Sequence, residues 1–442
     1  MQFLERRFQL AAHGTTATRE AFAGLTTFLT MGYIVFVQPA VLSAAGMDFG
    51  AVMVATCLST ALATALMAVM ANYPIAVAPA MGHNFFFAYS VVVGMKVPWQ
   101  VALGAVAIAG LVFVLTAGVG LREHVITAIP ESLKHAIAAG IGLLIAMVGL
   151  QWAGLVVASP GTLVTLGTLH GRPTLVALAG LAVTAALMAR GVTGALLWGI
   201  LVSAAIAFPL GILQYHGIAS APPSLGPTLL QLDIAGALVP RMLPVVFVFF
   251  FLALFDSIGT LVAVGGLAGL TRGHTLPRAK QALLADAVGT VAGAALGTST
   301  VTAYIESSAG VAAGGRTGLT AIVTAVLFLL TLFISPLVRM IGGGYTAGGT
   351  TLYPVVAPAL ILVGALIIGS VRDIDWKDPT EAIPAFLTII VMPLAVSITE
   401  GVAFGVVAYV ILKVAAGRRR QVHPLLYVFA LLFVVRYAFL RG

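Results

Sequence analysis

The fold is decided by residues 297–315, which read GTSTVTAYIESSAGVAAGG. Polar, β-prone residues fill positions 298–302, glycines flank the stretch, and one acid, Glu306, lies within it. This pattern predicts a short extended segment that leads into a half-helix beginning near Glu306. Such a break exposes backbone N–H and C=O groups, and the helix N-terminus adds a partial positive charge.

A second broken segment lies much earlier in the chain, at residues 73–90, and reads YPIAVAPAMGHNFFFAYS. Each broken segment is the third apolar span of a group of seven. Because seven is odd, the two groups must cross a membrane in opposite orientations. Paired interrupted segments in an inverted repeat indicate a transporter with its site near the membrane midplane.

The composition sets the class of protein. Of 442 residues, 60% are hydrophobic and 8% are charged, against about 45–50% and about 25% in soluble domains. This excludes a soluble, disordered or nucleic-acid-binding protein, and the single cysteine, Cys57, excludes a disulfide scaffold. We therefore expect an all-α polytopic membrane protein, with short strands in its two broken spans.

Fourteen spans follow from the apolar runs and their breakers. They lie near 20–45, 50–71, 74–94, 98–120, 134–157, 173–190, 193–213, 241–266, 279–296, 298–314, 317–339, 353–370, 382–397 and 400–416. A further apolar stretch at 424–440 either crosses the membrane or lies along its surface.

The distribution of basic residues predicts the orientation. With the N-terminus inside, four of the 22 lysines and arginines fall outside (Lys96, Arg172, Arg241, Arg339) and two lie within or after the last stretch (Arg436, Arg441). The remaining sixteen, Arg122 and Arg272 among them, fall inside, as the positive-inside rule requires. The pI of 9.8 reflects the basic residues of the inside loops.

Four acids fall in or at the edge of apolar spans: Asp256, Asp286, Glu306 and Glu400. An ionisable group at bilayer depth costs about 2.5–3.5 kcal/mol on insertion scales, so it is expected to serve a function. The carboxylate of Glu306 could accept two hydrogen bonds from a planar heterocycle; alternatively, it is a structural acid in a re-entrant bend. Asp256 could exchange a proton during transport or stay protonated against a neighbouring helix.

Asn84 occupies the break of the first half, where its amide can both donate to and accept from the edge of a base. If this stretch is extended, its neighbour His83 points the other way. Asp286 is either a proton relay or a tie between helices, and Glu400 complements a helix N-terminus. No motif of an ATP-driven pump, zinc protease or serine hydrolase is present in the sequence, so no enzyme activity, cofactor or metal is expected.

At several motifs the chain resembles the AzgA-like purine permeases, a branch of the nucleobase–cation symporter-2 (nucleobase–ascorbate transporter) superfamily. The motifs are REAFAGLTTFLTMGYIVFVQP at 19–39, MGHNFFFAY at 81–89, LFDSIGTL at 254–261, ADAVGT at 285–290 and GTSTVTAYIESSAGVAAGGRTGLTA at 297–321. The resemblance implies 14 transmembrane segments in a 7+7 inverted repeat. It also implies a core domain (1–133 and 240–340), and a gate domain (134–239 and 341–442) that forms a homodimer.

Carried over to this chain, the family's substrate site would comprise Asn84, Phe85, Asp256 and Glu306, and proton coupling would involve Asp256, Glu306 and Asp286. Two departures bear on substrate preference. Ala253 stands where some relatives have a second acid, and Phe85 stands where many have a small residue.

The resemblance implies a multi-pass importer of purine nucleobases in the cell (plasma or inner) membrane, driven by protons, with sodium left open. Among purines, guanine and hypoxanthine rank ahead of adenine, because a carboxylate seeks N–H groups. The alternative is an anion transporter or channel of the same architecture, like the sulfate transporters. Two acids in the site disfavour that alternative.

Overall fold

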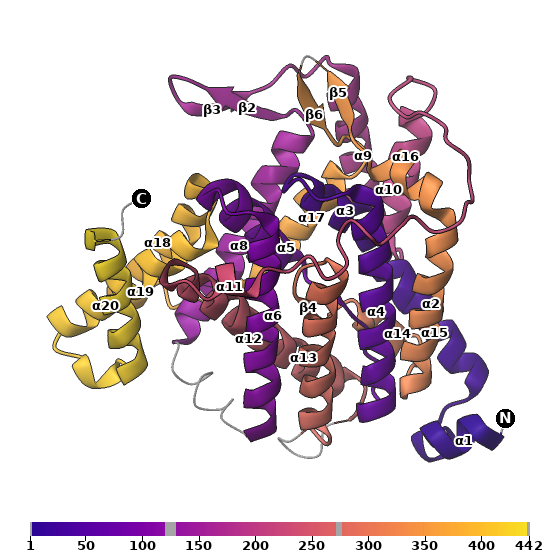
Figure 1. The fold of residues 1–442 in the computed structure, drawn as a ribbon, viewed down its shortest axis with the longest axis horizontal. Helices are drawn as coiled ribbons and strands as arrows, with labels where there is room; N and C mark the ends of the chain where they lie inside the picture. The colour runs from indigo at the N-terminus through magenta and orange to yellow at the C-terminus, as the bar shows by residue number, and fades with distance from the viewer. Residues whose placement is uncertain (1, 120–129, 271–275, 348, 440–442) are drawn as a thin grey trace.

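The computed structural model describes residues 2–119, 130–270, 276–347 and 349–439 (Figure 1). In these ranges eight helices are long and apolar enough to cross a membrane, and three shorter apolar helices accompany them. The protein is therefore a multi-pass, helical membrane protein. Arg122 and Arg272, counted above as inside residues, lie outside the described ranges.

The elements of the first half follow the predicted spans. They are α1 (Gln2–Phe8), η1 (Ala11–His13), α2 (Ala17–Met31), α3 (Ile34–Ser43), α4 (Phe49–Ala71), β1 (Val77–Pro79), α5 (Met81–Phe85), the π-helix η2 (Phe86–Gly94), α6 (Trp99–Val119), α8 (Glu131–Trp152), β2 (Val156–Ser159), β3 (Leu163–Leu166), α9 (Arg172–Ala189), α10 (Ala195–Ala207) and α11 (Ile234–Ala237). The fifth span ends at Trp152, five residues before the predicted end, because the chain turns into β2.

The second half also places a short strand and a short helix after its second long helix. Its elements are η3 (Pro240–Met242), α12 (Leu243–Leu267), α13 (Ala279–Leu296), β4 (Val301–Ala303), α14 (Ser307–Ala312), α15 (Gly318–Thr331), η4 (Leu332–Ile334), α16 (Ser335–Gly342), β5 (Tyr345–Ala347), β6 (Thr350–Leu352), α17 (Ala357–Ile367), η5 (Ile368–Asp373), α18 (Pro379–Ala395), α19 (Ile398–Ala415), η6 (Arg419–Gln421) and α20 (Pro424–Phe439).

The helices form two groups. In one, α4 and α6 pack against α13, α15 packs against α2 and α4, and α12 packs against α6. In the other, α8 packs against α17 and α18, and α18 packs against α19. In Figure 1, α18 and α19 of the second group lie to the left of α6 and α12 of the first, and α20 lies outermost. Each group takes helices from both halves of the sequence.

The two broken spans meet in a buried antiparallel ladder. Val77 of β1 pairs with Ala303 of β4, and all six residues of the two strands are buried. A threonine braces each strand: Thr64 of α4 bonds both the N–H (2.9 Å) and the C=O (3.0 Å) of Val77. Thr290 of α13 does the same for Val301, at 3.3 and 2.8 Å. The two threonines are equivalent, because α4 and α13 are the second span of their halves. This equivalence reflects the inverted repeat.

Two further hairpins were not predicted. β2 pairs with β3, and β5 pairs with β6, and both hairpins project from the same end of the molecule in Figure 1. The side chains of β3 are all exposed. These hairpins lie outside the broken spans, so the strands of the protein are not confined to those spans.

The buried lysine Lys413, near the end of α19, holds this helix to the start of α18. Its Nζ lies 2.7 Å from Glu381 and 3.7 Å from Asp378. Thr380, through its backbone N–H and its hydroxyl, and Arg418 lower the pKa of Asp378 to about 2. The Asp378 carboxylate therefore stays charged at any physiological pH.

The apolar stretch after α19 forms one helix, α20, which packs along α19. The Phe429 ring of α20 packs on Phe247 of α12, with the ring centroids 4.4 Å apart. Phe249, Phe250 and Phe251 of α12 are buried. The phenylalanine run of α12 therefore serves packing.

Candidate functional site

The β1–β4 ladder holds the starts of two short helices together. Beyond the paired residues, the Ala80 N–H donates to the Thr300 carbonyl (3.0 Å) and the Tyr304 N–H donates to the Ala76 carbonyl (2.9 Å). Helix α5 begins directly after Ala80, and α14 begins at Ser307. The side chains of both broken spans are therefore presented at one junction.

Glu306 stands in the N-cap position of α14, where its side chain makes no capping hydrogen bond. The Tyr33 hydroxyl donates to Glu306 Oε1 over 2.8 Å, and the Thr30 hydroxyl donates to the Glu306 backbone carbonyl over 3.3 Å. Glu306 is partly exposed, although its neighbour Ser307 is fully buried. The carboxylate is thus anchored at one oxygen, in a residue that is itself only partly buried.

Asp256 faces the same ladder from the middle of α12. The Thr302 hydroxyl of β4 donates to Asp256 Oδ2 over 2.8 Å. Like Glu306, Asp256 is partly exposed, while the next residue, Ser257, is fully buried. Two partly exposed acids, Asp256 on α12 and Glu306 at the start of α14, therefore lie at the same junction.

Asp286 of α13 lies behind the strand. It is fully buried, and its Oδ2 accepts a hydrogen bond from the Ala303 N–H over 3.2 Å. The other oxygen, Oδ1, has no hydrogen-bond partner among the described residues. Asp286 therefore supports β4 through Oδ2, while its Oδ1 is a buried acceptor that no hydrogen bond uses within the described ranges.

Asn84 lies in helix α5, and not on the extended stretch considered above for it and His83. Its Nδ2 donates to Gln38 Oε1 (2.5 Å), while Gln38 Nε2 donates to the hydroxyls of Thr298 (2.9 Å) and Ser299 (3.0 Å). Asn84 Oδ1 is buried and has no partner in the described part of the chain. The Gln38 amide thus links Asn84 to the second broken span and leaves the Asn84 carbonyl available.

Phe85 follows Asn84 and is fully buried. Its ring stacks on Tyr89, with centroids 5.7 Å apart and planes 10° apart. The neighbouring His83 is also buried, and its Nε2 has no partner in the described ranges. Phe85 and Tyr89 thus form a stacked aromatic pair that begins one residue after Asn84.

With this geometry established, comparison with known proteins identifies the family. Residues 18–404 match the family Xan_ur_permease, described as "Permease family". The chain belongs to this permease family. The match includes both broken spans and every candidate residue named above, and it confirms the resemblance inferred from the motifs.

Similar permeases come from archaea and bacteria. The chain is 50% identical to "Putative permease MJ0326" of Methanocaldococcus jannaschii, over 100% of both chains. It is 46% identical to "Adenine permease AdeP" of Escherichia coli (99% of this chain, 96% of the relative). It is 44% identical to "Guanine/hypoxanthine permease PbuO" of Bacillus subtilis (97% and 99%). These relatives are named as permeases and not as enzymes.

The fold has a solved counterpart. The transmembrane domain of the cyanobacterial bicarbonate transporter BicA matches with a TM-score of 0.64 and 19% identity, over 88% of this chain and 97% of that one. This permease therefore has the 7+7 inverted-repeat fold with core and gate domains. At this identity the likeness concerns the fold alone.

Three polar residues of the permease were not assigned a role from its sequence. Tyr33 and Gln38 both lie in the 19–39 motif that carried the resemblance, and they bond Glu306 and Asn84. The third, Glu20, is fully buried and accepts hydrogen bonds from the backbone or side chains of Arg316, Thr317 and Thr320. The sequence signal that could have identified them is the 19–39 motif, because these polar residues interrupt an apolar span there.

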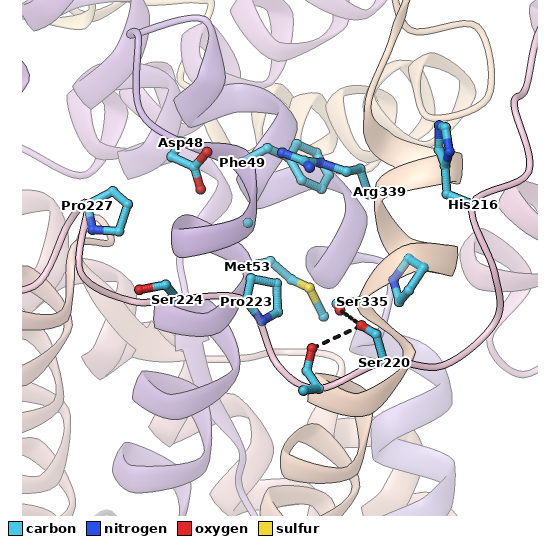
Figure 2. A pocket seen from close by; sticks show the side chains of 13 residues that line it. Asp48, Phe49, Met53, His216, Ser220, Pro223, Ser224, Pro227, Ser335 and Arg339 are labelled. Atoms are coloured by element: carbon cyan, nitrogen blue, oxygen red, sulfur yellow. Dashed lines mark hydrogen bonds between the residues drawn. The ribbon is translucent and has the colours of Figure 1, made fainter.

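A cavity of about 620 Å³ lies elsewhere, between the start of α4, the 216–227 connection and α16. Figure 2 shows Asp48, His216 and Arg339 around it, with Ser220 hydrogen-bonded to Ser335. None of the candidate residues lines this cavity. Among the described residues, no three His, Cys, Asp or Glu side chains are grouped as a metal site would need.

Proposed function

We propose that this permease imports purine nucleobases by proton symport with alternating access. The observation that carries the proposal is the pair of partly exposed acids, Asp256 and Glu306, beside the buried β1–β4 ladder. Ionisable groups in membrane spans mark substrate or ion pathways. The names of the adenine and guanine/hypoxanthine permeases among its relatives support purines as the substrate class.

Glu306 is the proposed anchor of the base. A carboxylate that accepts from two adjacent N–H groups matches the N1–H and 2-amino groups of guanine. The free carbonyl of Asn84 supplies another acceptor, fixed in direction by Gln38. Phe85, packed on Tyr89, provides the apolar wall next to Asn84, against which a second ring of the substrate gains contact.

Asp256 is the proposed proton carrier. Thr302 donates to one of its oxygens, so the other is free to take and release a proton. Asp286 is the proposed reserve site: its unpartnered Oδ1 lies in the layer behind β4, and its other oxygen holds the strand. A proton on Asp256 would neutralise one of the two acids and so reduce the repulsion between them.

The two groups of helices are the proposed moving parts. The group with α4, α6, α12, α13 and α15 corresponds to the core domain (1–133 and 240–340), and the group with α8, α17, α18 and α19 to the gate domain (134–239 and 341–442). We infer that the N-terminus is cytoplasmic, from the charge distribution, and that two gate domains form a homodimer in the cell membrane.

An anion transporter is the alternative, and the bicarbonate transporter BicA has the same fold. The side chains argue against it here. Two carboxylates at the substrate position would repel an anion, whereas they attract N–H donors and protons. Competition by bicarbonate and sulfate should therefore leave purine uptake unchanged.

The test is uptake of labelled hypoxanthine, guanine and adenine into cells that lack their own purine permeases, with and without a protonophore. We expect concentrative uptake that the protonophore abolishes and that removal of sodium does not affect. Uptake of none of the three bases would refute the substrate class. Concentrative uptake that survives the protonophore but requires sodium would refute proton coupling and keep the substrate class.

A further inference from the structure

The junction between α2 and α3 has no role in the mechanism described so far, although it lies within the 19–39 motif. The helix breaks at Gly32 and Tyr33, and Tyr33 is 1% exposed. A side chain at position 32 would come within 2.8 Å of the Phe28 carbonyl, so glycine is needed for the break. The break thus places a tyrosine hydroxyl deep in the protein at a fixed position.

The hydroxyl of Tyr33 makes one hydrogen bond within the described part of the chain, to Glu306 Oε1 at 2.8 Å. A carboxylate can only accept, so towards ionised Glu306 the phenol must donate. Donation to the ionised form stabilises that form over the protonated one. Tyr33 therefore favours a Glu306 that presents acceptors, not a donor, to the substrate.

The other polar groups around Glu306 do not replace this effect. From α12, Asp256 adds negative charge and is itself engaged by Thr302. At the end of β4, the Tyr304 hydroxyl donates to the Pro79 carbonyl over 2.5 Å. Thr30 of α2 contacts the backbone of Glu306 and not its carboxylate. Tyr33 is thus the side chain that donates directly to the acid.

The purines differ in what they need from this acid. Guanine and hypoxanthine present an N1–H donor, which requires an acceptor. Adenine presents N1 as an acceptor beside its 6-amino group, which suits a protonated acid that donates from one oxygen and accepts at the other. Buried polar groups left without partners discriminate between such analogues far more strongly than a small change in shape does.

We propose that Tyr33 is a specificity-determining residue, whose hydroxyl holds Glu306 as an acceptor and so favours 6-oxopurines over adenine. This inference rests on the proposed function, because it takes Glu306 as the group that binds the base. It assigns the selectivity to a residue that itself need not contact the substrate.

The test is Tyr33→Phe, which removes one hydroxyl and keeps the ring. The measured quantity is the ratio of the adenine and guanine concentrations that halve uptake of labelled hypoxanthine. We expect this ratio to fall about tenfold or more, in favour of adenine, because hydrogen bonds to charged groups are worth about one to two powers of ten. The matched control is Tyr73→Phe, which removes a hydroxyl that donates to the Pro277 carbonyl, and its ratio should equal that of the wild type.

Replacing Tyr33 by 3-fluorotyrosine gives a second test that keeps the fold intact. Its hydroxyl is a stronger donor, so the ratio should move the opposite way, in favour of guanine. Unchanged ratios in both variants would overturn the role of Tyr33. Glu306→Gln separates the two proposals: if that variant loses uptake while the Tyr33 variants keep the wild-type ratio, only the role of Tyr33 fails. If Glu306→Gln keeps wild-type affinity for every base, the proposed site itself fails.

Discussion

Glu306→Gln should weaken base uptake severely while the protein still reaches the membrane. Glutamine has one acceptor oxygen, and the Tyr33 hydroxyl would hold it, because that hydroxyl already lies 2.8 Å from Oε1. The amide NH₂ would then face the N1–H of the base, donor against donor. Losing a charged acceptor costs about 1.5–3 kcal/mol, which corresponds to an affinity loss of about 10- to 100-fold.

The assay is the KM for labelled hypoxanthine in permease-deficient cells, corrected for the amount of protein in the membrane. Asp373→Asn, at an exposed acid outside the spans, controls for the loss of a negative charge and should keep the wild-type KM. A wild-type KM for Glu306→Gln would remove Glu306 from the site and return it to the role of a structural acid in the bend.

The remaining predictions concern coupling, selectivity and stability. Asp256→Asn should still bind hypoxanthine but fail to concentrate it, as measured by binding and accumulation in parallel; if accumulation with proton uptake persists, Asp286 becomes the candidate carrier. In competition with labelled hypoxanthine at neutral pH, guanine should be more effective than adenine, and uracil should fail. Thr290→Val should lower stability by about 1–3 kcal/mol, seen in thermal unfolding, because it leaves buried N–H and C=O groups of Val301 unpaired. Glu20→Gln should lower the unfolding temperature in the same assay, since one oxygen of that carboxylate accepts from both Thr317 and Thr320.

The broken spans could be predicted from the sequence because their signal is chemical as well as periodic. An apolar span that turns into the polar run 298–302 between glycines has few ways to satisfy its backbone in a membrane. The backbone groups at the end of this run are paired in the β1–β4 ladder. The ladder places Glu306 directly before α14, as expected. Carboxylates in apolar spans stand out because burying them is costly, so the sequence also singles out Asp256 and Glu306 as candidates.

Tyr33 and Gln38 were missed for a different reason. A tyrosine or glutamine in an apolar run needs a hydrogen-bond partner when it is buried. The run itself does not say which helix supplies that partner. Their role depends on which helices meet: Tyr33 reaches a residue 273 positions later in the chain, and Gln38 bonds Asn84 and residues 260 and 261 positions later. The sequence pattern contains no information on contacts of that range. The hairpins β2–β3 and β5–β6 were missed because short strands in connecting loops lack the long alternation that predicts a strand.

The two halves of this permease are alike in how they hold their strands, but they differ in the polar side chains at the proposed site. The braces Thr64 and Thr290 are equivalent in the two halves, so each half builds its strand in the same way. The proposed substrate-binding groups are not equivalent, because the first half presents the amide of Asn84 and the second presents the carboxylate of Glu306. A site with two identical halves would bind a base equally well in two orientations. The unequal pair, with acceptors of different charge on its two sides, can hold an asymmetric purine in one orientation only. The inverted repeat therefore supplies the position of the site, and the differences between the halves supply its selectivity.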